Sequence, residues 1–89
     1  MSKATTQLLK RYVAILNITN SKQYICSEYI QTLLKEDYGI DVVKRVVQRD
    51  LLFLFQVGAV ECKGNTPKGW RSMGIEGFGE KLSSFKGDL

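Results

Sequence analysis

The sequence has no histidine, a single proline, and two cysteines, Cys26 and Cys62, that lie far apart in the chain. A tetrahedral zinc site needs more cysteine or histidine ligands than this, so no structural metal is expected. There is no CxxC pair, and both thiols stand among apolar neighbours, so we expect them to be reduced and buried. The scarcity of proline, together with long stretches of apolar residues at helical spacing, favours helices over a many-turned all-β fold.

Long apolar runs are also missing. None approaches the roughly 20 residues that a membrane-spanning helix requires, and the N-terminus lacks the apolar core of a signal peptide. No membrane partner is therefore expected, and a cytoplasmic location is predicted. The sequence contains no catalytic triad pattern, no suitably placed carboxylate pair and no phosphate-cradling glycine loop, so a non-enzymatic function without a cofactor is predicted.

What the sequence does contain is an excess of positive charge in one part. Its 89 residues include 13 Lys and Arg against 9 Asp and Glu, and 44% of them are hydrophobic, which fits one small globular domain. Residues 1–73 carry 11 basic and 6 acidic residues, net +5, whereas residues 74–89 carry 2 and 3, net −1. The positive field belongs to the predicted folded segment, which suggests an anionic partner.

Three helices are predicted by apolar residues at helical spacing. The first begins near Thr5 or Thr6, either of which can act as N-cap, and the second runs from an N-cap at Ser27 to a stop at Gly39. The third begins after an N-cap at Asp41 and covers residues 42–56. Two short helices joined by so tight a connection are typical of a helix-turn-helix. The apolar face of the first helix comprises Leu8, Leu9, Tyr12, Val13, Ile15 and Leu16, with Lys10 and Arg11 mostly on the other side. The buried stripe of the second comprises Tyr29, Ile30, Leu33 and Leu34.

Three short strands complete the predicted fold. Residues 59–62 and 70–73 flank a turn that contains Gly64, Pro67 and Gly69, and residues 24–26 form a minor strand that must pair with one of them. The fold class is therefore predicted to be α+β, a winged helix-turn-helix with three helices and a small antiparallel hairpin as the wing, within residues 1–73. Residues 74–89 contain four glycines and are predicted to be a tail that docks or takes part in dimerisation.

The third predicted helix separates an apolar face from a polar one. Val43, Val47, Leu51 and Leu54 cluster on one side, while Arg45, Gln48, Arg49, Leu52 and Gln56 spread over the other, with Lys44 at its flank. A helix fits the major groove of double-stranded DNA, where Arg can read guanine and Gln can read adenine. We therefore predict base contacts by Arg45, Gln48 and Arg49, and contacts to the DNA backbone by Lys44, Lys63, Lys68 and Arg71.

Other residues of this region are assigned structural roles. Asp50 projects toward the core side of the third helix, where a carboxylate needs a partner, so we expect it to pair with a neighbouring basic group. Trp70 is expected to cover a small core. Leu52, Phe53 and Phe55 exceed what one buried stripe explains and need cover from the wing, the tail or a second subunit, so a homodimer is predicted.

Two segments resemble a known family. Residues 44–51, KRVVQRDL, are similar to the RTVQRDL segment in the recognition helix of WYL-domain transcriptional regulators, whose N-terminal winged helix belongs to the DeoR-like group. Pro67-Lys68-Gly69-Trp70 resembles the PxGW that closes their wing, and the likeness extends over residues 8–72. The resemblance implies a bacterial or phage regulator that binds operator DNA. Val46 replaces the family's usual Thr, and nothing in the 89 residues corresponds to the WYL effector domain, so no small-molecule effector is implied.

The prediction is thus sequence-specific binding of double-stranded DNA by a small transcriptional regulator, most plainly a repressor. The alternative keeps the fold but uses it as a protein–protein interaction module, an anti-repressor or inhibitor that binds through the apolar edge of the third helix.

Overall fold

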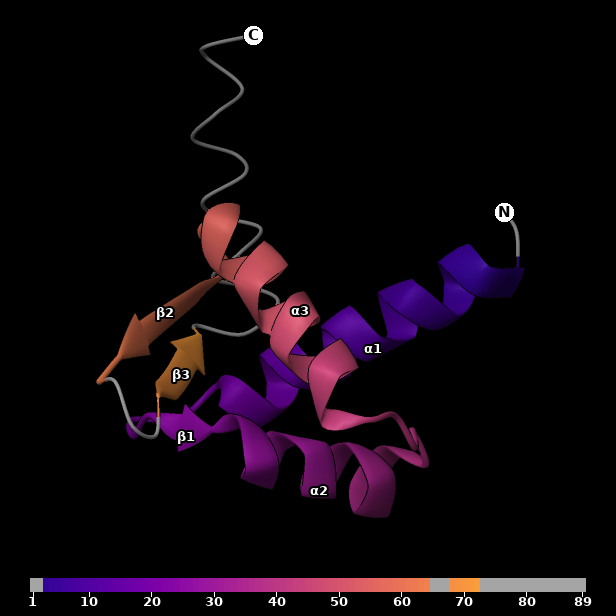
Figure 1. Cartoon of the computed structure of the whole chain (residues 1–89), viewed down its shortest axis with the longest axis horizontal. Coiled ribbons are helices and arrows are strands. Elements are labelled where there is room, and N and C mark those ends of the chain that lie inside the picture. The colour runs from indigo at the N-terminus through magenta and orange to yellow at the C-terminus, as the bar shows by residue number, and fades with distance from the viewer. Residues whose placement is uncertain (1–2, 65–67, 73–89) are drawn as a thin grey trace, which may run out of the picture.

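A computed structural model describes residues 3–64 and 68–72 of the chain. These residues form a small α+β unit of three helices and one three-stranded antiparallel sheet, as predicted (Figure 1). The elements, in order, are α1 (Lys3–Thr19), β1 (Ile25–Cys26), α2 (Ser27–Tyr38), α3 (Lys44–Gln56), β2 (Val60–Lys63) and β3 (Gly69–Ser72). The predicted tail 74–89, Met73 at the end of the predicted last strand, and residues 65–67 of the predicted turn lie outside the described residues.

The sheet has β3 at its centre, between β1 and β2. Ile25 of β1 and Cys62 of β2 both lie opposite Trp70, so the short early strand pairs with the returning strand of the hairpin, as the sequence requires. Gly69 allows this approach because a Cβ atom there would lie 2.6 Å from the Cβ of Tyr24. The sheet occupies one side of the molecule and the helices the other, with α2 along the lower edge and α3 rising across α1 (Figure 1).

The core lies where the three helices meet the inner face of the sheet. Its largest fully buried side chains come from all three helices, and Trp70 closes it from β3 at 7% exposure, which confirms the structural role predicted for that residue. Four residues of the predicted apolar faces are exposed: Val43 at 63%, Tyr29 at 53%, and Leu9 and Val13 at 45% each. The two cysteines, Cys26 and Cys62, were expected to be buried but are half-buried. The buried hydrophobic residues are Ala14, Ile15, Leu16, Ile30, Leu34, Val47, Leu51, Leu54, Ala59, Val60 and Trp70.

The connection between α2 and α3 is longer than predicted. Gly39 ends α2 in the left-handed conformation, with φ of 66°, and its amide and that of Ile40 donate to carbonyls in the last turn of the helix. The chain then stays extended through Val43, which is the N-cap of α3 and makes no side-chain capping bond, so the prediction of Asp41 as N-cap is wrong. Val42 is held by the core on one side and accepts a hydrogen bond from Gln31 Nε2, which keeps this stretch from joining the helix.

The other two helices begin earlier than predicted. α1 begins at Lys3, ahead of Thr5 and Thr6, because Lys3 and Ala4 are good helix formers that extend the first turn. α2 begins at Ser27, which was predicted as its N-cap. Cys26 is the N-cap instead, because it is the last residue of β1, where it pairs with Gly69, and its side chain makes no capping hydrogen bond. Within the described residues, no helix combines the length and the apolar character that crossing a bilayer requires.

Candidate nucleic-acid interface

The outward face of α3 carries three long polar side chains. Arg45, Gln48 and Arg49 are all exposed, and their spacing of three and four residues places them side by side on the helix. None of the three makes a side-chain hydrogen bond or an ion pair with any residue in the described part of the chain. Val47, Leu51 and Leu54 on the opposite face are buried, which confirms the predicted division of this helix apart from Val43.

The rotation of α3 is fixed by a buried ion pair between Asp50 and Arg11 of α1. The pair is bidentate: Nε donates to one carboxylate oxygen of Asp50, and Nη2 donates to the other at 3.1 Å. The Asp50 side chain is only 3% exposed and that of Arg11 15%. The hydrogen bond to Asp50 raises the pKa of Arg11 against the effect of burial, so the cation persists. This confirms the structural role predicted for Asp50, and because α3 cannot turn without breaking the pair, Arg45 and Arg49 are held outward.

Arg11 is a residue that the sequence reasoning misplaced. It was expected mostly on the outer side of the first helix, but it faces α3, as does its neighbour Tyr12, whose ring stacks on Phe53 at a centroid distance of 5.3 Å. Burial raises the pKa of the Tyr12 hydroxyl and the charge of Asp50 adds to this, while Arg11 and Arg49 oppose it. The signal that could have found Arg11 was Asp50 itself, because a carboxylate on a core face demands a cation from a facing element.

Lys44, at the start of α3, is engaged with α2. Its Nζ lies 2.8 Å from a carboxylate oxygen of Glu28, in a pair whose two side chains are well exposed. The hydrogen bond and charge of Lys44 lower the pKa of Glu28. Lys44 therefore lies at the flank of the α3 face, as predicted, but in the structure its partner is a carboxylate of the same chain.

The charged residues of the hairpin are also tied to the fold. Arg71 of β3 is 3.1 Å from the carboxylate of Glu61, and its guanidinium lies 4.9 Å from the centre of the Tyr24 ring. Lys63 Nζ lies 5.7 Å from the centre of the same ring. Lys68 is exposed, and within the described residues its side chain has neither a hydrogen bond nor an ion pair. Of the three predicted hairpin contacts, Lys68 is the one whose side chain has no partner within residues 3–64 and 68–72.

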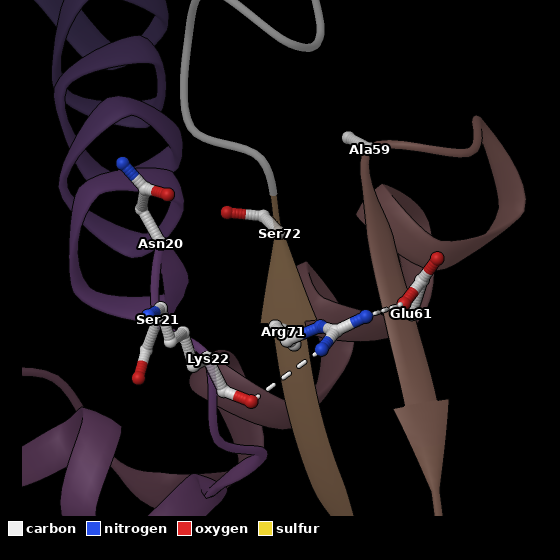
Figure 2. Close-up of a pocket in the computed structure, with 7 residues that line it drawn as sticks. All are labelled: Asn20, Ser21, Lys22, Ala59, Glu61, Arg71 and Ser72. Atoms are coloured by element: carbon white, nitrogen blue, oxygen red, sulfur yellow. Dashed lines mark hydrogen bonds and ion pairs between the residues drawn. The ribbon is translucent and has the colours of Figure 1, made fainter.

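A shallow hollow of about 410 Å³ lies on the outer side of the sheet, beside the end of α1. Figure 2 shows Arg71 crossing it, with its guanidinium between the Glu61 carboxylate and the backbone carbonyl of Lys22, to which it donates at 3.4 Å. The charges of Arg71 and Glu61, which lie across this hollow, satisfy one another. No cluster of three or more potential metal ligands occurs in the part of the chain that the structure describes. The hollow is lined by Asn20, Ser21, Lys22, Ala59, Glu61, Arg71 and Ser72.

Comparison with known proteins does not assign the chain to a family: no family model matches it, and neither the search of curated proteins nor that of solved structures gives a significant match.

Proposed function

We propose that the chain is a winged helix-turn-helix protein that binds double-stranded DNA in a sequence-specific manner. In this proposal α2 and α3 form the helix-turn-helix, α3 lies in the major groove, and the β2–β3 hairpin is the wing. The protein acts as a small transcriptional regulator of the bacterial or phage type, a repressor, in keeping with the resemblance of residues 44–51 and 67–70 to the WYL-domain regulators.

The observation that carries the proposal is the unengaged polar face of α3. Arg45, Gln48 and Arg49 are exposed together, without a side-chain hydrogen bond or ion pair among the described residues, on a helix that Asp50 and Arg11 hold in a fixed rotation. The planar fork of Arg matches the O6 and N7 acceptors of guanine, and the amide of Gln matches the N6 and N7 edge of adenine. A rigid helix with such side chains pointing outward meets the geometric requirement for reading base edges.

Contacts to the DNA backbone are proposed for the cations around this face. Lys44 lies at the N-terminal end of α3, and Lys63, Lys68 and Arg71 lie on the hairpin. Lys44 and Arg71 must exchange an exposed carboxylate for a phosphate, which is feasible because exposed ion pairs contribute little. Two copies of so small a module on adjacent half-sites is the usual route to useful affinity, so a homodimer belongs to the proposal.

The test is selection of bound duplexes from a random pool, followed by fluorescence anisotropy with the selected duplex and a scrambled one. We expect salt-sensitive binding and a preference for the selected duplex. Arg45→Ala should weaken binding to the selected duplex by about 1–3 kcal/mol and relax the base preference at one position. Lys10→Ala is the matched control, because it also removes one exposed positive charge but lies on α1, away from α3 and the hairpin.

One observation favours a second candidate, a protein–protein interaction module. Leu52, Phe53 and Phe55 of α3 are 51%, 45% and 47% exposed, more apolar surface than a helix on DNA requires. Absence of salt-sensitive duplex binding at micromolar protein would refute the DNA proposal and leave this one. In that case Leu52→Glu should abolish binding to the partner protein, and Arg45→Ala should not.

A further inference from the structure

The C-terminal half of α3 presents an apolar band on the same outward face whose N-terminal half carries the arginines. In the helical projection Phe55, Leu52 and Phe53 cross this face in that order, from the sheet to α1. Phe55 lies edge-on to Trp70 with ring centroids 6.3 Å apart, and Phe53 stacks on Tyr12, yet each of the three apolar residues remains about half exposed. We call Leu52, Phe53 and Phe55 the apolar band.

The described chain leaves the fold beside this band. Ser72, the last residue of β3, lies opposite Val60, which follows the end of α3 by four residues. The hydroxyl of Ser72 also donates to the carbonyl of Leu16 at 2.8 Å. Tyr12, the stacking partner of Phe53, lies one helical turn before Leu16. The point where residue 73 begins is therefore close to both flanks of the band.

The sequence of residues 73–89 has the pattern to cover such a surface. Its apolar residues Ile75, Phe78, Leu82, Phe85 and Leu89 follow one another at intervals of 3, 4, 3 and 4, which places them in one narrow stripe on a helix. Two heptads are too short for a coiled coil on their own, and Gly74, Gly77, Gly79 and Gly87 disfavour an isolated helix. Such a stripe gains stability only against a surface that is already folded.

We propose that residues 73–89 dock on the apolar band of their own chain, with Phe78 and Phe85 as the main anchors. Phe78 is six residues beyond Ser72, a reach of up to about 20 Å, which suffices to cross the outer face of one helix. The segment carries a net charge of −1 and the rest of the chain +5, so the overall sign of the charge favours docking. The inference does not depend on DNA binding.

The test is photocrosslinking in the full chain, with a photoreactive benzoylphenylalanine placed at Leu52. We expect crosslinks at the mass of a single chain that map to residues 73–89. The double variant Phe78→Ser/Phe85→Ser should lower their yield about tenfold, because it removes most of the anchoring apolar area. The variant Ser83→Ala/Ser84→Ala, off the stripe, should leave the yield unchanged. These substitutions lie outside the described core, and circular dichroism checks that each chain folds.

A probe at Tyr29 is the control for chance contact, because that residue is equally exposed but lies on α2. Crosslinks at twice the chain mass, traced with mixed isotope-labelled and unlabelled protein, would mean that a second copy covers the band and would overturn the proposal. A yield at Leu52 no higher than at Tyr29 would overturn it as well.

Discussion

The two positively charged surfaces of this protein, the outer face of α3 and the outer face of the hairpin, differ in what their charges do. On α3, Arg45 and Arg49 have no ion-pair partner among the described residues. On the hairpin, Arg71 is paired with Glu61, stacked on Tyr24 and bonded to a backbone carbonyl (Figure 2). The same +1 charge is therefore available for a ligand on the outer face of α3 and takes part in internal contacts on the hairpin.

The difference arises from where the acidic residues stand. α3 has a single carboxylate, Asp50, which is buried toward Arg11 and leaves the outer face of the helix without an acidic residue. In the hairpin, Glu61 and Arg71 face each other across two strands, so each satisfies the other. A count of basic residues therefore overstates the positive charge that the hairpin has available for a ligand, whereas on the outer face of α3 the charge of Arg45 and Arg49 has no ion-pair partner among the described residues.

The largest expected effect concerns the ion pair on which the orientation of α3 depends. Asp50→Ala leaves the Arg11 guanidinium buried without a partner, so it should lower the free energy of unfolding by about 3–5 kcal/mol in urea denaturation. Asp37→Ala, at an exposed carboxylate of α2, should change it by less than about 0.5 kcal/mol.

The double variant Arg11→Met/Asp50→Leu separates charge from packing. It replaces both ions by apolar side chains of similar size, so it should recover most of the loss. If Asp50→Ala proves as stable as the parent chain, the pair does not hold α3, and the contrast between a fixed helix and a self-satisfied hairpin fails.

The next effect compares one arginine from each surface. Arg49→Ala should weaken binding to the selected duplex by about 1–3 kcal/mol, with a change in base preference and little change in unfolding free energy. Arg71→Ala should leave base preference unchanged, since its proposed contact is with a phosphate, while stability falls by up to about 1 kcal/mol because the contacts with Glu61 and Tyr24 are lost. Anisotropy titration and urea denaturation of both variants measure the two quantities.

The result that would remove the contrast is a change in base preference for Arg71→Ala as large as that for Arg49→Ala. A loss of binding that is equal for selected and scrambled duplexes is what the proposed contact of Arg71 with a phosphate predicts, and it leaves the contrast with Arg49 in place. Lys68→Ala serves as the reference for such a contact and should reduce the salt dependence by about one unit.

Much of the fold follows from local pattern. The helices follow from apolar residues at helical spacing, Gly39 from the need for a left-handed residue at the end of α2, and the pairing of Ile25 with β3 from the fact that so short a strand cannot stand alone. The buried position of Asp50 also follows, because the projection that makes Arg45 and Arg49 exposed places Asp50 on the other side.

The features that could not be predicted from the sequence depend on tertiary contacts. Arg11 faces α3 because it pairs with the buried carboxylate of Asp50. A helical projection of α1 alone contains no information about a residue on another helix. α3 begins at Lys44 because Gln31 and the core hold Val42 in an extended stretch, against the local preference for a cap at Asp41. The pairs Arg71–Glu61 and Lys44–Glu28 could not be predicted either. The first depends on the register of two strands and the second on how α2 and α3 pack together.

The smallest expected effect concerns Lys44, the one basic residue of α3 that has an ion-pair partner in the described chain. Lys44 lowers the pKa of Glu28 below its ordinary value of 4.5, so the pair contributes stability that is present above that pH and is lost as the pH falls through the lowered pKa. Glu28→Gln removes this contribution. In urea denaturation from neutral pH downward, the unfolding free energies of parent and variant should therefore differ slightly at neutral pH and converge in acid. The control is Glu36→Gln, at an exposed glutamate without an ion-pair partner among the described residues, which should show no such convergence. If the difference in unfolding free energy between parent and Glu28→Gln stays constant with pH, Lys44 is not held by Glu28. Lys44 would then belong with Arg45 and Arg49 to the charges of α3 that have no ion-pair partner in the part of the chain that the structure describes.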